Sequence, residues 1–372
     1  MTINVMVVDD SVVIRRLVSK VLDEDPDIRV VGTAVNGRVA LSKLNQLAPD
    51  LVTLDIEMPE LDGLETLREL RKTHPRLPVV MFSTLTERAA KATLEALALG
   101  ANDYVAKPAN VGSVALGMES VRSQLIPKIK SLCARQLSGG PAATAVPARP
   151  PATAAPRPSA PVAAPTAVST APPRVLGIGC STGGPEALTA VLKALPGDLP
   201  VPVVVVQHMP PVFTAMFAQR LDTHCALRVR EARDGDVLEP GLVLLAPGDF
   251  HMTVVTVGGR QQVKLDQSPP QSWCRPAVDP LFRSLAEVYG GATLAVVLTG
   301  MGQDGLRGAE RLRAAGAPVV VQDEATSVVW GMPGAIATAR LATRVLPLQQ
   351  VAGEVLSALA PLRTGALAAA RR

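Results

Sequence analysis

A serine lies in a glycine-rich segment at residues 174–185, which read Arg-Val-Leu-Gly-Ile-Gly-Cys-Ser-Thr-Gly-Gly-Pro. The apolar start predicts a strand, and Pro185 predicts the first turn of a helix. A turn of this kind projects the hydroxyl of Ser181 beyond the sheet edge, beside free N–H groups that can hold an oxyanion. The G-x-S-x-G pattern of Gly179 to Gly183 suits acyl transfer, but the same turn suits a phosphate cradle without a nucleophile. This segment alone therefore leaves two kinds of site open.

Two other predicted strands end in residues that would complete a hydrolytic set. Residues 203–208, Val-Val-Val-Val-Gln-His, form the apolar run of a strand buried on both faces and end in His208. Residues 293–305 repeat the design and place Asp304 after a glycine-rich turn. Ligands of open α/β sheets bind outside the carboxyl ends of the strands, so Ser181, His208 and Asp304 are expected to face one crevice. In such a set the serine attacks, the histidine takes its proton and the aspartate orients the imidazole.

Each residue of this set also has a structural interpretation. Asp304 could cap a helix, as Asp279 before Pro280 is expected to do, and His208 could belong to the core. Their joint placement at strand ends favours catalysis. The order Ser, His, Asp disfavours the α/β-hydrolase fold, in which the acid precedes the histidine. Cys180 is expected to point into the sheet interior as a small buried hydrophobe rather than to act as the nucleophile.

Polar residues also end successive predicted strands near the amino terminus. Asp9 and Asp10 follow the first strand and Asp55 ends a later one, and carboxylates gathered in this way suit Mg²⁺. An aspartate can also accept a phosphoryl group as a nucleophile. Ser83 and Lys107 end the next two strands, where a hydroxyl and an ammonium group could bind phosphoryl oxygens. The pattern predicts a phospho-acceptor site.

The amino-terminal portion resembles a response-regulator receiver domain, on the strength of these strand ends and of Asn-Asp-Tyr-Val-Ala-Lys-Pro at residues 102–108. The resemblance implies a flavodoxin-like fold in which Asp55 is the phospho-acceptor. It further implies a set of Mg²⁺ ligands, Asp9, Asp10, Asp55 and Glu57, and a set of switch residues, Ser83, Tyr104 and Lys107.

The carboxyl-terminal portion resembles the catalytic domain of the chemotaxis protein-glutamate methylesterases. The matching segments are Gly-Cys-Ser-Thr-Gly-Gly-Pro at 179–185, Gln-His-Met-Pro at 207–210 and Gly-Met-Gly-Gln-Asp-Gly at 300–305. The resemblance implies that Ser181 is the nucleophile, His208 the base and acid, and Asp304 the orienting residue, with Thr182 and Met301 supporting the oxyanion. Many members carry a histidine before Arg275-Pro276, whereas this chain has Ser272-Trp273-Cys274, which leaves the preferred receptor open.

The implied function is phosphorylation-activated hydrolysis of glutamate methyl esters on the cytoplasmic domains of chemoreceptors, which releases methanol, together with deamidation of receptor glutamines. A chemotaxis histidine kinase would supply the phosphoryl group, Mg²⁺ would serve the receiver domain, and ester hydrolysis would need no cofactor. The unphosphorylated receiver is expected to pack over the Ser181 crevice. Two alternatives remain open, a phospho-regulated hydrolase acting on another ester and a non-catalytic binding module.

Composition favours two α/β domains, since 372 residues with 48% hydrophobic and 19% charged residues is ordinary for a globular protein of that size. Residues 131–173 are dominated by Ala, Pro, Thr and Ser and predict a flexible linker. It would join a receiver domain at 1–130 to a mostly parallel, doubly wound, Rossmann-like catalytic domain at 174–365. Within the second domain, Gly258-Gly259 predicts a hairpin at His251–Gln267.

Charge and cysteine content exclude several other classes. Seven arginines of the predicted linker and the tail carry the excess charge; without them the formal net charge of +4 becomes −3, so no specific nucleic-acid surface is expected. The four cysteines show no C-x-x-C spacing, which favours neither zinc nor a disulfide framework. Neither a leader pattern nor an uncharged stretch long enough to insert into a membrane is present, so a cytoplasmic protein is expected.

Overall fold

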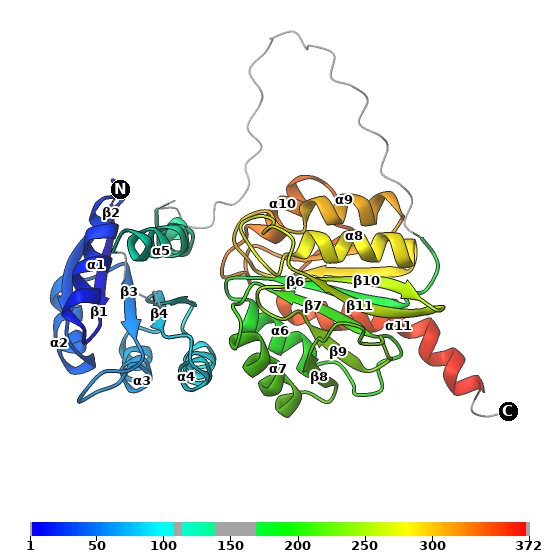
Figure 1. The fold of residues 1–372 in the computed structure, drawn as a ribbon, viewed down its shortest axis with the longest axis horizontal. Helices are drawn as coiled ribbons and strands as arrows, with labels where there is room; N and C mark the ends of the chain where they lie inside the picture. The colour runs from blue at the N-terminus through cyan, green and yellow to red at the C-terminus, as the bar shows by residue number, and fades with distance from the viewer. Residues whose placement is uncertain (1, 108–113, 138–168, 370–372) are drawn as a thin grey trace, which may run out of the picture.

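The computed structural model describes residues 2–107, 114–137 and 169–369, which form two parallel sheets covered by helices and one two-stranded hairpin (Figure 1). The first domain comprises β1 (Ile3–Val8), α1 (Val12–Asp23), β2 (Ile28–Ala34), α2 (Gly37–Leu47), β3 (Leu51–Asp55), α3 (Gly63–Thr73), β4 (Val79–Ser83), α4 (Glu87–Ala98), β5 (Asp103–Ala106) and α5 (Val114–Leu137).

The second domain comprises β6 (Val175–Cys180), α6 (Gly184–Lys193), β7 (Val203–Gln207), α7 (Phe213–His224), β8 (Arg228–Glu231), β9 (Leu242–Leu245), β10 (His251–Val257), β11 (Arg260–Asp266) and α8 (Val278–Tyr289). It continues with a short 3₁₀ turn (Gly290–Ala292), β12 (Thr293–Val297), α9 (Leu306–Ala314), β13 (Val319–Gln322), α10 (Met332–Thr338), β14 (Arg344–Leu346) and α11 (Leu348–Ala369).

The first sheet has the order β2-β1-β3-β4-β5, and every strand pair in it is parallel. β3 and β4 are buried along their whole length, which explains their continuous apolar sequences. The order makes β1, β3, β4 and β5 successive neighbours, so their carboxyl ends lie along one edge. The predicted phospho-acceptor site was expected at these same ends.

α5 is longer than composition indicated. It continues to Leu137, and Leu125, Ile129 and Cys133, spaced four residues apart, are buried in the core of the first domain. The predicted linker boundary at residue 131 is therefore too early. Composition does not distinguish a linker from a helix end, whereas burial of one face keeps this segment helical. Residues 138–168 of the predicted linker lie outside the described residues. Ser169 already lies along the second domain, where its N–H donates to the Gly316 carbonyl oxygen.

The second sheet has the order β14-β13-β12-β6-β7-β9-β8 and is also parallel throughout. The chain adds strands on one side of β6 and then on the other, so the topological switch point lies between β6 and β12, beside the strand that carries Ser181. The predicted hairpin is confirmed: β10 and β11 pair in antiparallel register, and Gly258 and Gly259 have positive φ in the turn. The expected combination of a flavodoxin-like and a doubly wound α/β domain is confirmed.

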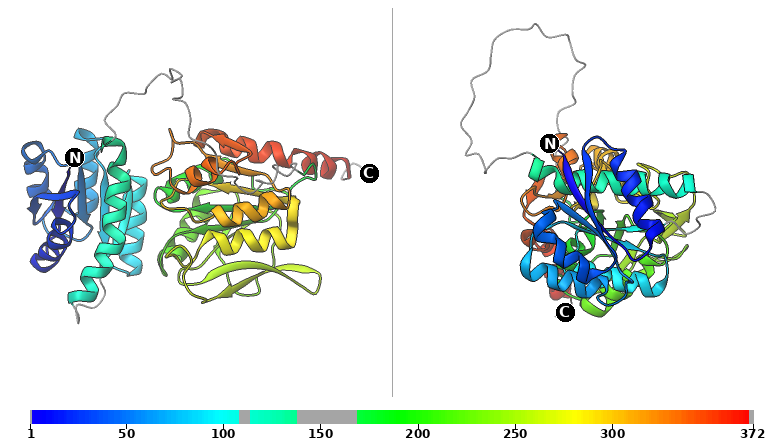
Figure 2. Two further views of the ribbon diagram at one scale, coloured as in Figure 1. Left: turned by 90° about the horizontal axis from the view of Figure 1, so that it is seen from above. Right: turned by 90° about the vertical axis from the view of Figure 1, so that its left-hand side faces the viewer.

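The two domains lie side by side along the long axis of the molecule (Figure 2). α4 packs against α6 and α7. The ring of Tyr104 on β5 stacks on that of Phe213 on α7, with centroids 4.8 Å apart and planes 1° apart. One cluster of buried apolar side chains includes members of both domains. Among the described residues, no helix has both the length and the apolar character needed to cross a bilayer.

Because Ile129 is fully buried, truncation by Ile129→Ala should destabilise the first domain by about 2–5 kcal/mol. Both tryptophans, Trp273 and Trp330, lie in the second domain, so fluorescence would not report this loss. Hydrogen-exchange mass spectrometry of residues 2–107 in increasing urea measures it directly. Lys72→Ala, at an exposed position on α3, is the control and should change the midpoint little. Equal midpoints for both variants would contradict the assignment of α5 to the core.

Candidate active site

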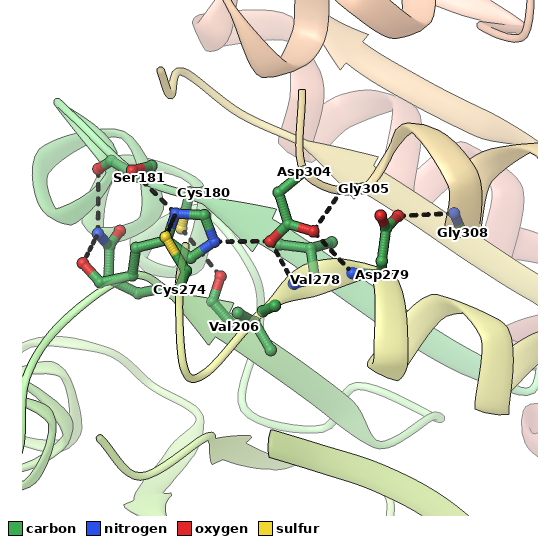
Figure 3. A network of polar contacts seen from close by, with 12 residues as sticks. Cys180, Ser181, Val206, Cys274, Val278, Asp279, Asp304, Gly305 and Gly308 are labelled. Atoms are coloured by element: carbon green, nitrogen blue, oxygen red, sulfur yellow. Dashed lines mark hydrogen bonds and ion pairs between the residues drawn. The ribbon is translucent and has the colours of Figure 1, made fainter. Parts of the chain in front are cut away.

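The three predicted catalytic residues follow three adjacent strands, since β12, β6 and β7 are neighbours in the sheet. His208 Nδ1 lies 3.1 Å from Ser181 Oγ, and His208 Nε2 lies 2.7 Å from Asp304 Oδ2 (Figure 3). A carboxylate only accepts hydrogen bonds, so the ring proton belongs on Nε2 and Nδ1 is left to accept from the serine hydroxyl. One imidazole therefore links a hydroxyl to a buried acid, which is the geometry of an activated nucleophile.

The turn that carries Ser181 is fixed by hydrogen bonds to neighbouring strands. The Ser181 N–H donates to the Thr299 carbonyl oxygen at 3.0 Å, and Gln207 Nε2 donates to the Ser181 carbonyl oxygen at 3.0 Å. Gly183 has a φ of +75°, and a Cβ there would lie 2.5 Å from Val328 Cγ2. The turn thus requires glycine for conformation and for space. The sequence analysis did not predict that Gln207 holds this turn, because nothing in an apolar strand indicates that its one amide side chain contacts a neighbouring loop.

Two backbone N–H groups near Ser181 are the predicted donors of an oxyanion hole. Thr182 follows Ser181, and Met301 follows Gly300, whose backbone is so close to Ser181 that a Cβ on it would lie 2.9 Å from Ser181 Cβ. Within residues 169–369, neither the Thr182 nor the Met301 N–H donates a hydrogen bond to another protein group. Unengaged donors beside a nucleophile suit an oxyanion hole, and the predicted support by these two residues stays a prediction.

Asp304 is 1% exposed, and hydrogen-bond donors surround its carboxylate. Its Oδ2 accepts from the Val278 N–H at 2.6 Å, and its Oδ1 accepts from the N–H groups of Asp279 and Gly305 at 3.0 and 2.9 Å. Burial alone would raise the pKa of Asp304, but the hydrogen bonds and charge of His208 and the backbone donors outweigh it and lower the pKa. The carboxylate therefore stays ionised and can hold an imidazolium.

The helix-cap interpretations fail at both aspartates. α8 begins at Val278 after Ala277, so Asp279 lies inside the first turn, where its Oδ1 accepts from the Gly308 N–H at 2.7 Å. The prediction that Asp279 is the N-cap of this helix is wrong, because Asp304 supplies the acceptor for the first N–H groups of α8 from a distant loop. Asp304 likewise does not cap its own helix, since the N-cap of α9 is Gly305.

The imidazole of His208 has a third neighbour. Cys274 Sγ lies 3.4 Å from Nδ1, the nitrogen that also faces Ser181. Burial alone would lower the pKa of His208, but the negative charges of Cys274 and Asp304 and their hydrogen bonds raise it to about 10. Sequence reasoning singled out the segment at 272–274 without assigning Cys274 this contact. Cys180, as expected, is fully buried, and burial raises the pKa of its thiol.

The acidic site of the first domain is assembled as expected. Carboxylate oxygens of Asp9, Asp10 and Asp55 all lie within 4.8 Å of one another. Lys107 Nζ lies 2.9 Å from Asp9 Oδ2 and 2.7 Å from Asp55 Oδ2. Burial, aided by the charges of Asp9 and Asp10, raises the pKa of Asp55 to about 6 against the lowering effect of Lys107. Such an all-oxygen group with excess negative charge fits Mg²⁺.

Glu57, Ser83 and Tyr104 have different surroundings. Glu57 is not among the grouped carboxylates; its Oε1 lies 3.7 Å from Arg88 Nε, and it lines an open pocket with Asp10, so its share in a metal site stays a prediction. Ser83 is buried at the end of β4, and its Oγ accepts from Thr93 Oγ1 at 2.8 Å. Tyr104 is buried against the second domain, and burial raises the pKa of its phenol.

Asp103 is a residue that sequence reasoning missed. Thr182 Oγ1, in the second domain, donates to Asp103 Oδ2 at 2.6 Å, and Lys128 Nζ lies 2.8 Å from the same oxygen. A hydroxyl that donates to a carboxylate at this distance is a strong, charge-assisted hydrogen bond. The residue next to Ser181 therefore forms a hydrogen bond directly to the first domain. No pattern in either segment predicts the pair, because it exists only where the domains meet.

Sequence comparison identifies relatives of both domains. Residues 176–355 match the family model for CheB methylesterase, and residues 5–115 match that for the response regulator receiver domain. A protein-glutamate methylesterase/protein-glutamine glutaminase of Nocardioides sp. is 56% identical over 362 residues, which cover 97% of this chain and 96% of that protein. One of Trichodesmium erythraeum is 49% identical over 352 residues, covering 95% and 97%. The crystal structure of the Thermotoga maritima CheB methylesterase catalytic domain is 42% identical, covers 50% of this chain and 98% of that chain, and superposes with a TM-score of 0.49.

Replacing Asp304 with asparagine should lower the pKa of His208, because the carboxylate beside the ring is lost. A nearby opposite charge shifts a pKa by roughly one to three units, and a fall of that size is expected. NMR titration of the ring C–H signals measures it, with exposed His224 as the internal reference. A titration of His208 that matches the wild type would contradict the assignment of Asp304 as its partner.

Proposed function

This chain belongs to the protein-glutamate methylesterase/protein-glutamine glutaminase family, and we propose that Ser181, His208 and Asp304 carry out its hydrolysis. It is a chemotaxis response regulator, in which a receiver domain makes a methylesterase domain subject to phosphorylation. The enzyme hydrolyses methyl esters of protein glutamate, releasing methanol, and deamidates protein glutamine. The observation that supports the residue roles is the single imidazole within hydrogen-bond distance of both Ser181 Oγ and Asp304 Oδ2.

The reaction follows from this geometry in two steps. Ser181 Oγ attacks the ester carbonyl carbon while its proton passes to His208 Nδ1, and Asp304 stabilises the imidazolium through Nε2. The imidazolium returns the proton to the departing methoxy group, so methanol leaves and an acyl-enzyme remains. Water then attacks the acyl carbon with His208 as the base, and glutamate and free Ser181 are regenerated. Attack on a glutamine side chain releases ammonia instead and gives the same glutamate product.

Each attack places negative charge on the former carbonyl oxygen. The N–H groups of Thr182 and Met301 are our candidates for stabilising that charge, because they flank Ser181 and are not engaged within the described part of the domain. Removing one donor of an oxyanion hole typically costs about 10²–10³ in kcat.

Chemoreceptors are the substrate and a histidine kinase is the phosphodonor in the general scheme of this family. We propose that the methylated glutamates lie on the cytoplasmic domains of the receptors and that the enzyme works in the cytoplasm. We further propose that Asp55 accepts the phosphoryl group. Asp9, Asp10 and Asp55 would hold Mg²⁺, which supplies positive charge for the phosphoryl oxygens, and Lys107 would bind one of those oxygens.

We propose that the unphosphorylated receiver restrains the esterase by packing beside Ser181. Two contacts support this, the hydrogen bond from Thr182 to Asp103 and the stacking of Tyr104 on Phe213. Both receiver residues lie on β5, and Lys107, which contacts Asp55, directly follows that strand. A phosphoryl group on Asp55 would compete for Lys107 and shift the equilibrium toward separated domains. Residues 138–168 keep the domains in one chain when they separate.

Replacement of Ser181 with alanine should abolish methanol release from methylated chemoreceptor membranes, with a loss of at least about 10³-fold. Addition of a small phosphodonor and Mg²⁺ should not restore it. Asp55→Ala keeps the triad and should retain basal release while losing stimulation by the phosphodonor. Release by Ser181→Ala at the wild-type rate would contradict catalysis by the serine, and no release by the wild type from confirmed methylated receptors would favour a different ester as substrate.

Replacement of Asp103 with asparagine should raise methanol release by the unphosphorylated enzyme several-fold, because it removes the charge that holds Thr182 to the receiver. The phosphodonor should then stimulate release less than it does in the wild type. Asp50→Asn, at a carboxylate that accepts only from Asn4 N–H among the described hydrogen bonds, is a matched control outside the interface. Unchanged basal release in Asp103→Asn would contradict restraint through this contact.

A further inference from the structure

Cys274 is held against the imidazole by a tight turn. Gln271 and Cys274 exchange backbone hydrogen bonds, at 3.1 Å from the Gln271 N–H and 2.9 Å from the Cys274 N–H. The two central residues, Ser272 and Trp273, have φ of +50° and +65°. Two successive left-handed residues are typical of a type I′ turn, and this conformation is unfavourable for residues other than Gly and Asn. A turn kept in this conformation fixes the direction in which the Cys274 side chain leaves the backbone.

The chain is anchored again immediately after this cysteine. Arg275 Nη2 and Nε lie 2.6 and 3.0 Å from Asp249 Oδ1, and Arg275 Nη1 donates to the carbonyl oxygens of Gln267 and Ser268. Three residues further on, the Val278 N–H donates to Asp304 itself. Cys274 thus directly precedes two anchors, one of which is the carboxylate of Asp304. Its position beside His208 is built into the segment.

The thiol and the serine hydroxyl share one nitrogen. Cys274 Sγ is 3.4 Å and Ser181 Oγ is 3.1 Å from His208 Nδ1, which has a single lone pair when the ring is neutral. None of the other three cysteines has such a partner: Cys133 and Cys180 are buried, and Cys225 lies at the end of α7, and burial raises the pKa of all three thiols. Burial disfavours thiolate at those sites, whereas a thiol beside an imidazole can transfer its proton.

The groups that face His208 from each neighbouring element are acidic or neutral. Asp304 comes from the loop before α9, Cys274 from the turn before α8, and Ser181 from the end of β6, while Asp279 lies behind Asp304. The nearby cation Arg275 is occupied by Asp249. Among the described contacts of the ring, no cation opposes the negative groups. This environment favours the protonated ring.

We propose that Cys274 is a positioning residue for His208. The Cys274 thiol shares one proton with the ring at Nδ1, and this sharing sets the pH above which the ring can accept the proton of Ser181. Transfer of the proton from Sγ to Nδ1 gives a thiolate and an imidazolium without any change in net charge. In that form Nδ1 is occupied and Ser181 cannot be activated. Loss of the shared proton to solvent frees Nδ1. This inference rests on the proposed role of His208 as the general base.

The direction of the pH effect follows from the charges. Negative charge on Cys274 and Asp304 raises the pKa of His208, so the ring keeps its blocking proton to a higher pH than an ordinary histidine. Activity should therefore rise with pH through the shared pKa. Without the thiol, that pKa should fall, and the acid limb of kcat/KM should move to lower pH.

The first test is the pH dependence of kcat/KM for methanol release by full-length wild type, Cys274→Ala and Cys274→Ser, each with phosphodonor and Mg²⁺. Both variants should shift the acid limb down by about one unit or more, which gives roughly tenfold higher kcat/KM on the acid side. Cys225→Ser controls for loss of a thiol and should match the wild type. A purely structural role predicts instead that Cys274→Ala loses activity equally at every pH and that serine restores it, which would overturn the proposal.

The second test needs no substrate and separates this inference from the proposed function. The rate of iodoacetamide alkylation of each cysteine is measured by peptide mass spectrometry across pH in Ser181→Ala and in Ser181→Ala/His208→Gln. Cys274 should react faster than Cys225 at neutral pH in the first protein and should lose that advantage in the second. Reactivity of Cys274 that is independent of His208 overturns the proposal, even where methanol release is normal. Reactivity that depends on His208 supports the shared proton, even where no ester substrate is hydrolysed.

Discussion

The arrangement of the catalytic site depends on the interactions of one buried carboxylate, that of Asp304. An ionised group with 1% exposure would cost several kcal/mol if it were left unpaired. It is instead surrounded by the imidazole of His208, by the first N–H groups of α8 and by the turn before α9. The positive end of the α8 dipole adds to its stabilisation. The need to satisfy one charge therefore fixes the ring, and the ring fixes what Ser181 can do.

A second constraint connects the two domains through one short strand. β5 has only four residues, yet Asp103 and Tyr104 on it contact the catalytic domain, and Lys107 just beyond it contacts Asp55 and Asp9. A change in the partners of Lys107 thus occurs within a few residues of the interface. The buried apolar cluster that includes members of both domains makes that interface a packed surface, and packed surfaces change between discrete arrangements rather than deform continuously.

Sequence patterns predicted the parts of this molecule that depend on the ends of parallel strands. Ser181, His208 and Asp304 could be assembled in advance because parallel strands bring their carboxyl ends to one edge, whatever lies between them in sequence. The same rule gathered Asp9, Asp55 and Lys107. Contacts that depend on one particular loop or on the packing of the two domains could not be predicted from such a pattern. Cys274 reaches the ring only through the left-handed turn at 272–273, and Asp103 meets Thr182 only where the domains pack.

The errors at helix boundaries have a related cause. Local rules assign a helix start to the nearest acidic residue and a helix end to a change in composition. Here Asp304, which lies 26 residues from Val278, accepts from the first N–H groups of α8, so Asp279 is not needed as a cap. The apolar face of α5 continues to Cys133 through residues whose composition alone resembles a linker. Tertiary contacts decided both boundaries, and tertiary contacts are what a single sequence shows least.

Asp304 and Cys274 act on the same ring in opposite senses, although both are negative when ionised. Asp304 holds the proton on Nε2 and thereby presents the lone pair of Nδ1 to Ser181, an arrangement that is needed in the transition state. Cys274 interacts with Nδ1 itself, so it stabilises the protonated ring before any substrate is attacked. Only interactions that are stronger in the transition state than in the ground state accelerate a reaction. A partner on the reactive nitrogen therefore restrains the base, whereas a partner on the opposite nitrogen prepares it.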